Sequence, residues 1–328
     1  MHPFAARPFS FASPLPDLAV RLAALRSQVE HRLAELVPPP DDVHDLMGAA
    51  LHEGVLAPGK RIRPLLMLLV GDSLGHQSPA LLDLGCAVEM VHAASLFLDD
   101  MPCMDNARLR RGRLAVHARF GQDVAVLGAV ALVSQACGIA ASVQGLPGEV
   151  PARLVRVLCR AVGLQGLVRG QYRDLREGAA ARRIEDIAST NQQKTGSLFS
   201  AGFEMAGLAA GADEAVCSAL RQAALELGQA FQLRDDIQDR TGTPAHCGKD
   251  SNKDAGKSTL VALLGLKPAQ QRLARHLDEA HNQLHAALGP DQTVSRWVHE
   301  AFALSPLPRS QHLARRTESR VSPSEQRC

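Results

Sequence analysis

Helical periodicity runs through most of this 328-residue chain and constrains its fold more than any other feature. Apolar residues recur three or four positions apart from Leu18 to Leu36, after Asp17, which suits a helix N-cap. Similar patterns predict helices over 43–56, 61–74, 79–100, 122–143, 151–175, 184–209, 213–239, 258–263 and 269–287. The alternation of β-branched and aromatic residues that marks strands is nearly absent. The sequence therefore predicts an all-α fold.

We expect one folded domain over residues 17–305, because no linker divides the middle of the chain. Residues 1–16 are rich in Pro, Ala and Phe and predict a loose arm; Arg7 is their only basic residue, which gives little support to a transit peptide. Pro, Ser, Arg and Gln dominate residues 306–328, which predicts a disordered, mildly basic tail.

Composition excludes several classes of protein. Hydrophobic residues make up 46% and charged residues 21%, as in ordinary globular proteins. A net charge of +2, with one Trp and one Tyr, argues against a nucleic-acid partner. Seven scattered cysteines without a C-x-x-C pair indicate neither a disulfide framework nor a zinc site. The N-terminus lacks the pattern of a secretory signal, so we expect a cytoplasmic protein.

The stretch from Val124 to Gly148 has no charged residue and could suggest a membrane span. However, Ser134, Gln135, Ser142 and Gln144 interrupt it, and Ala and Gly outnumber Leu and Ile. It predicts a buried helix rather than a transmembrane segment.

A first group of aspartates, Asp99, Asp100 and Asp105, follows a strongly apolar helical stretch. On an ideal helix Asp99 and Asp105 would lie about 120° apart. Pro102 disfavours helical geometry at Met101 and bends the chain, so that Asp105 can turn back toward Asp99. A surface turn is the alternative, but aspartates left unpaired beside a core are costly.

A second group, Asp235, Asp236 and Asp239, ends another helical stretch. Asp235 and Asp239 share one face, with Gln232 one turn earlier on nearly the same side. Like charges placed in this way repel, so a cation should lie between them. Two such groups indicate hard divalent cations with oxygen ligands, most simply Mg²⁺.

Basic residues are grouped around both acidic clusters and indicate where a phosphate could bind. They are Lys60, Arg63, Arg110, Arg111, Lys194, Lys249, Lys253 and Lys257. Each alone is more often a solvated charge, but the grouping suits a diphosphate held by metal and Lys or Arg together. His92 lies seven residues before Asp99 on the same helical face and would point toward the same site.

These motifs, in this order between about residues 40 and 300, resemble the trans-polyprenyl diphosphate synthases, and in detail the bacterial geranylgeranyl diphosphate synthases of carotenoid pathways. The matching stretches are 59–64, 89–95, 99–105, 109–112, 170–175, 194–196, 228–239 and 248–259. The resemblance implies an isoprenoid-synthase bundle around a central cavity and a homodimer. It also implies Mg²⁺ as cofactor, about three ions per site, with Mn²⁺ able to substitute.

The resemblance also implies roles for individual residues. Isopentenyl diphosphate would be held by Lys60, Arg63, His92 and Arg111, and the allylic diphosphate by Arg110, Lys194, Lys249 and Lys257. The main metal ligands would be Asp99, Asp105 and Asp235, supported by Asp100, Asp236 and Asp239. The reacting end would be lined by Lys194, Thr195, Gln232, Gln171 and Asp174. Pro58 and Asn106 depart from the family's usual residues, but neither replaces a ligand.

Product length is expected to depend on small residues one turn before the first aspartates. Ala94 and Ser95 stand where farnesyl-producing relatives carry a bulky aromatic, which favours a C20 product. Close helix packing is the other reading of these two residues. The alternatives to this function are a farnesyl-producing synthase, a head-to-head condensing enzyme or terpene cyclase, and a non-catalytic regulatory subunit of a heteromeric synthase.

Overall fold

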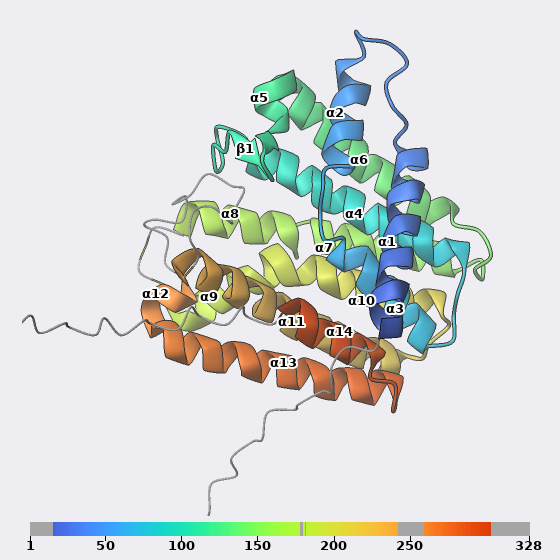
Figure 1. The fold of residues 1–328 in the computed structure, drawn as a ribbon, viewed down its shortest axis with the longest axis vertical. Coiled ribbons are helices and arrows are strands. Elements are labelled where there is room, and N and C mark those ends of the chain that lie inside the picture. Colours follow the sequence, from blue (N-terminus) through green and yellow to red (C-terminus); the bar gives the residue numbers. More distant parts are fainter. Residues whose placement is uncertain (1–15, 178–179, 181, 242–258, 303–328) are drawn as a thin grey trace, which may run out of the picture.

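The computed structural model describes residues 16–177, 180, 182–241 and 259–302. Over these residues the chain is a stack of helices with one short hairpin, so the predicted all-α fold is confirmed (Figure 1). The first elements are α1 (Pro16–Leu36), α2 (Leu46–Val55), α3 (Ile62–Ser73), α4 (Pro79–Asp99), the antiparallel strands β1 (Leu109–Arg110) and β2 (Arg113–Leu114), α5 (Val116–Phe120), α6 (Gln122–Ser142) and α7 (Val150–Val162). They are followed by α8 (Leu167–Glu177), α9 (Ile184–Asn191), the π-helix η1 (Gln192–Gly196), α10 (Ser197–Ala209), α11 (Glu214–Thr241), α12 (Leu260–Leu264), α13 (Leu266–Leu288) and α14 (Thr293–Phe302).

Most predicted helices are present, and the structure differs from the prediction in two respects. The helix predicted over 151–175 is broken between α7 and α8, where a Cβ on Gly166 would lie 2.0 Å from the Ala161 carbonyl oxygen. The hairpin, α5 and α14 were not predicted, because each is short and α14 shows its apolar face over only ten residues. Residues 1–15 of the predicted arm, the predicted tail and the segment 242–258 lie outside the described residues, whereas Pro16, assigned to the arm, begins α1.

The core is organised around α10 and α3, which are buried on nearly all sides. Every residue of α10 from Ala201 to Ala209 is buried, as is every residue of α3 from Pro64 to Gly71. α10 packs against α3, α4, α7 and α11. Helices that are apolar all round belong in the interior of a large domain. These two helices give the surrounding ones a fixed support.

α6 corrects the expectation of a fully buried helix. It buries a stripe of mostly small residues: Ala125, Gly128, Ala129, Leu132, Ala136 and Ala140. The opposite side leaves Val126, Leu127 and Val130 exposed by 42%, 58% and 63%. α4 and α6 are both long and apolar enough to cross a membrane by composition alone, but the α4 window is 67% buried and that of α6 only 39%. The core accounts for the apolar character of α4, whereas only half of α6 faces it.

The π-helix η1 is clamped between two glycines from neighbouring helices. A Cβ on Gly170 of α8 would lie 2.2 Å from the Lys194 amide nitrogen. A Cβ on Gly228 of α11 would lie 2.4 Å from the Gly196 Cα. Both contacts are with backbone, which cannot rotate away. π-Helical turns inside helices are frequent at functional sites, and this one carries Lys194 and Thr195.

We predict that Gly228→Ala destabilises the protein by about 1–3 kcal/mol, because the new methyl group forces α11 away from η1. Thermal unfolding followed by circular dichroism measures the change. Gly148→Ala is the control, since its Cβ would meet nothing within 4 Å. Equal melting temperatures for the two variants would contradict this tight packing.

Candidate active site

A cavity of about 720 Å³ unites the residues that the sequence singled out. Its walls come from the segment before α3, from α4, α8 and η1, and from the C-terminal turns of α11. Asp99 and Asp105 of the first acidic cluster line it together with Asp235, Asp236 and Asp239 of the second. The two clusters, more than a hundred residues apart in sequence, therefore face one space.

The first cluster adopts the turn that Pro102 predicted. α4 ends at Asp99, and the Asp105 amide donates a hydrogen bond of 2.9 Å to the Asp99 carbonyl oxygen. This places both carboxylates on the cavity wall. Burial raises the pKa of Asp99 to about 6; the nearby Lys194 ammonium opposes the shift and the Asp105 charge adds to it.

Asp100 has a different position from its two neighbours. It is only 3% exposed and is not among the residues lining the cavity. Its carboxylate accepts hydrogen bonds of 3.0 and 3.1 Å from Nε of Arg110. The residue predicted as a supporting metal ligand is thus, in this structure, the partner that orients the cavity-lining Arg110.

In the second cluster, Gln232 connects α11 to η1. Its amide nitrogen donates to Asp236 Oδ1 at 2.9 Å, and its carbonyl oxygen accepts from the Thr195 hydroxyl at 3.4 Å. Asp235 and Asp236 are half-buried, and Asp239 is exposed at the mouth. The predicted neighbours Thr195 and Gln232 are therefore in contact, on the wall that carries the aspartates.

The donor set fits Mg²⁺ shared with a substrate. Across the described ranges, no three His, Cys, Asp or Glu side chains are placed to hold an ion by themselves. Mg²⁺ commonly takes one or two carboxylates and completes its shell with water and substrate phosphates. Gln171, 7% exposed on the same wall, also has a buried Oε1 without a hydrogen-bond partner. Carboxylates around an open space match this chemistry.

Lys60, Arg63, His92 and Arg111 line the same cavity as a second group. The Arg63 guanidinium stacks over Phe199, 4.6 Å from the ring centroid, and burial lowers its pKa to about 10, so it stays charged at neutral pH. Burial, followed by the charges of Arg63 and Arg111, depresses the pKa of His92. His92 is therefore a neutral donor among cations.

Arg61, which the sequence analysis did not single out, holds this group in place. It is 4% exposed, has a left-handed φ of 49°, and donates to Glu89 Oε1 at 3.0 Å and to the Ala57 carbonyl oxygen at 2.9 Å. A non-glycine residue in this conformation needs support from its surroundings. The buried ion pair provides it and fixes the backbone between Lys60 and Arg63.

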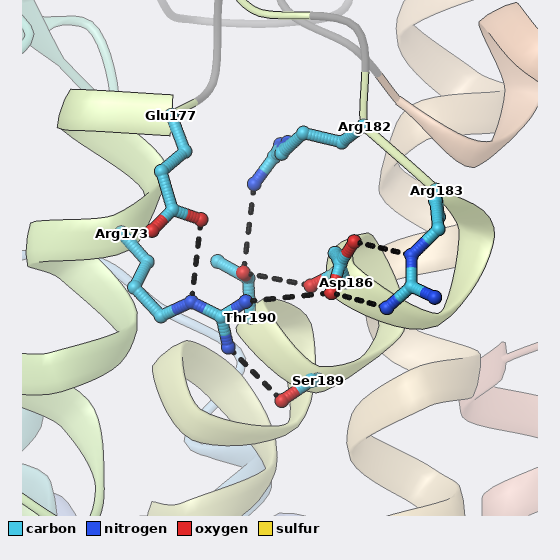
Figure 2. A network of polar contacts seen from close by, with 7 residues as sticks. All are labelled: Arg173, Glu177, Arg182, Arg183, Asp186, Ser189 and Thr190. Atoms are coloured by element: carbon cyan, nitrogen blue, oxygen red, sulfur yellow. Dashed lines mark hydrogen bonds and ion pairs between the residues drawn. The ribbon is translucent and has the colours of Figure 1, made fainter.

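Lys194 and Asp174 form an ion pair at 2.8 Å across the wall between η1 and α8. Beside it, Arg182 and Asn191 also line the cavity, although no sequence motif pointed to either. Figure 2 shows Arg182 reaching over α9 toward Thr190, whose hydroxyl accepts its hydrogen bond at 3.5 Å. Arg173 of α8 donates to Ser189 at 3.1 Å and ties the two helices together.

The structure separates the two residues predicted to set product length. Ser95 lines the cavity together with His92 and Asp99, whereas Ala94 is 2% exposed and is absent from the lining. Lys249 and Lys257, predicted to hold the allylic diphosphate, lie outside the described residues. Every other predicted site residue except Asp100 lines the cavity.

Comparison with known proteins gives the class. Residues 44–289 match the Polyprenyl synthetase family, and the chain belongs to it. A geranylgeranyl diphosphate synthase from Pantoea ananas is 51% identical over 281 residues, 85% of this chain and 91% of that protein. One from Pseudescherichia vulneris is 48% identical over 283 residues, 86% and 91% of the two chains. A Helicobacter pylori geranyltransferase, solved with magnesium and isoprenyl diphosphate, superposes with a TM-score of 0.76 at 28% identity, covering 89% of this chain and 98% of that one.

We predict that Asp99→Asn changes the pH dependence of stability when metal is removed with EDTA. The folded-state pKa of about 6 lies above the ordinary 3.8, so stability decreases as the pH rises between these values. Asparagine is neutral throughout. The variant should match wild type near pH 4 and melt about 2–6 °C higher at pH 7.5. A melting difference that is the same at both pH values would contradict the raised pKa.

Proposed function

We propose that the protein is a head-to-tail prenyltransferase that condenses isopentenyl diphosphate with allylic diphosphates to make geranylgeranyl diphosphate, a C20 product for carotenoid or other isoprenoid biosynthesis. The observation that carries the proposal is the shared cavity, in which two aspartate clusters face a separate group of cations. The names of the relatives at 48% and 51% identity support the same activity.

Two cationic groups suit two diphosphates. Arg110 and Lys194 lie with the aspartates and are assigned to the allylic diphosphate, whereas Lys60, Arg63, Arg111 and the neutral His92 are assigned to isopentenyl diphosphate. A head-to-head condensing enzyme or a cyclase has no need of the second group. Both acidic clusters are complete, which argues against a regulatory subunit.

The chemistry begins with departure of the allylic diphosphate. Mg²⁺, when bound through Asp99, Asp105 and Asp235, supplies positive charge that makes the diphosphate a better leaving group. Arg110, oriented by Asp100, and Lys194, held by Asp174, add donors to the same oxygens. The allylic C–O bond ionises and leaves a carbocation. We assign about three ions to each site, with Mn²⁺ as a substitute.

The remaining steps need a dry, polar wall. Thr195, Gln232 and Gln171 line the cavity, and we assign to the dipoles of their side chains the stabilisation of the cation. The double bond of isopentenyl diphosphate attacks the cation, a new C–C bond forms, and a proton is lost to the departing diphosphate. Water must be kept out, because it would convert the cation to an alcohol.

Incubation with isopentenyl diphosphate and each allylic starter, with and without Mg²⁺, followed by product sizing, tests the proposal. A C20 diphosphate that forms only with metal is expected. A C15 product would identify the farnesyl-producing alternative. Protein that is inactive alone but stimulates a partner synthase would identify the regulatory subunit.

We predict that Ser95→Phe shortens the product toward farnesyl diphosphate, because the ring would fill the cavity one turn before Asp99. Ala94→Tyr, which adds a bulky aromatic at the other position predicted to set product length, should instead overpack the core and lower the melting temperature, because Ala94 is buried outside the cavity. Chromatography of the dephosphorylated products gives the chain length. An unchanged C20 product from a folded Ser95→Phe enzyme would show that Ser95 does not limit the length of the product.

The proposal includes a homodimer. On α6, Val126, Leu127 and Val130 are exposed, and on α8 the apolar residues Val168, Tyr172 and Leu175 are exposed by 47%, 54% and 36% at helical spacing. Clustered exposed apolar residues mark interaction surfaces, and a second copy is the partner that the family resemblance implies. We also propose a cytoplasmic enzyme without a transmembrane segment, in which this face of α6 contacts protein rather than lipid.

We predict that Leu127→Glu weakens the dimer at least tenfold, because a carboxylate would be buried in the apolar contact. Sedimentation velocity over a range of concentrations measures the effect. Leu263→Glu, which changes a 48% exposed residue on α12, is the matched control and should leave the dimer intact. A Leu127→Glu protein that sediments like wild type would place the contact elsewhere.

A further inference from the structure

Arg234 is a buried cation that the established motifs do not use. It lies on α11 directly before Asp235, lines the active-site cavity, and is 8% exposed. Its Nε is buried without a hydrogen-bond partner, and its side chain makes no hydrogen bond within the described part of the chain. Its ion-pair contact there is with Asp235, at 3.9 Å. A guanidinium has five N–H donors, so most of this capacity is unused.

Two other arginines of the cavity have closer partners, although the Nε of Arg61 is also buried without a hydrogen bond. Arg61 donates to Glu89 and to the Ala57 carbonyl oxygen. Arg110 makes several hydrogen bonds to Asp100. Both are therefore neutralised by a nearby carboxylate. Removing a charge from water is costly unless it is paired in this way. Arg234 has, in place of such a hydrogen-bonded pair, only the contact of 3.9 Å with Asp235 within the described residues.

The neighbours of Arg234 indicate which anion is missing. Lys60 has a lowered pKa, caused first by burial and next by the positive charge of Arg234. The two cations are thus close enough to repel. Arg63 lies over Phe231, one turn before Arg234 on α11, at 5.9 Å from the ring centroid. Its own Nε is likewise buried without a partner. Lys60, Arg63 and Arg234 all line this one cavity.

We propose that Arg234 is a specificity-determining residue that binds the diphosphate of the homoallylic substrate, isopentenyl diphosphate, together with Lys60 and Arg63. Diphosphate oxygens would accept from the unused guanidinium donors and relieve the repulsion between the cations. The inference rests on the proposed prenyltransferase function. It adds to that function a contact from the helix that bears the second aspartate cluster.

The test compares wild type with Arg234→Gln, Arg234→Lys and the control Arg275→Gln, which removes an exposed arginine on α13. Calorimetric titration with isopentenyl diphosphate in EDTA measures binding without metal. Steady-state kinetics with farnesyl diphosphate and Mg²⁺ gives separate KM values for the two substrates. Melting temperatures of the ligand-free proteins report on folding.

We expect Arg234→Gln to weaken the binding of isopentenyl diphosphate about tenfold or more, and to raise the KM for isopentenyl diphosphate by the same factor. The KM for the allylic substrate should stay within about twofold of the wild-type value. The affinity of Arg234→Lys for isopentenyl diphosphate should lie between those of wild type and Arg234→Gln, and that of Arg275→Gln should match wild type. The ligand-free Arg234→Gln protein should melt no lower than wild type, because the buried charge that it loses has only a long contact of 3.9 Å with Asp235 within the described residues.

Three results would overturn the assignment: unchanged affinity for isopentenyl diphosphate, a rise confined to the allylic KM, or a lower melting temperature that reveals a structural ion pair. The proposed function and the role of Arg234 can be refuted separately. Wild-type protein that neither binds isopentenyl diphosphate nor elongates an allylic starter would refute the proposed function itself. Active wild type with an equally active Arg234→Gln variant would refute only the role of Arg234.

Discussion

Repulsion between carboxylates at the ends of two helices is the constraint on which this structure depends. Asp99 is the last residue of α4, and Asp235 to Asp239 occupy the final turns of α11, which ends at Thr241. The C-terminal end of a helix carries partial negative charge, so acidic residues there are unfavourable. Burial adds to this cost and raises the pKa of Asp99 to about 6. Such an arrangement is stable only where cations are supplied, by the protein around the cavity and by metal together with substrate.

The helices that are apolar on all sides make this arrangement possible. α3 and α10 are buried along most of their length, and α4 and α11 pack against α10. Because packed interiors resist deformation, the ends of α4 and α11 are held facing each other despite their charge. The contacts of Gly170 and Gly228 with η1 extend this rigidity to Lys194 and Thr195. The cavity is thus preorganised by the core rather than by its own loops.

The arginines of the cavity differ in whether their guanidinium groups are hydrogen-bonded within the protein. Arg61 and Arg110 are paired with Glu89 and Asp100, and these pairs orient backbone and side chains. The Nε atoms of Arg61, Arg63 and Arg234 are all buried without a hydrogen-bond partner, so what sets Arg61 apart is the pair of hydrogen bonds that its terminal nitrogens donate. The same residue type therefore serves two purposes, which differ in whether a carboxylate accepts a hydrogen bond from the guanidinium. This distinction supports the proposal that isopentenyl diphosphate binds on the side of Lys60.

The sequence by itself determined the helical architecture, the two aspartate clusters and the surrounding cations, because periodicity and motif spacing are local properties. It predicted the reversal after Asp100 from Pro102 alone. The tertiary structure decided which of two adjacent residues reaches the cavity: Asp99 rather than Asp100, and Ser95 rather than Ala94. Successive residues point about 100° apart on a helix, so only the position of the neighbouring helices separates them. Only the tertiary structure shows the roles of Glu89, Arg182 and Arg234, because these roles depend on residues distant in sequence. The exposed side of α6 could not be predicted for the same reason.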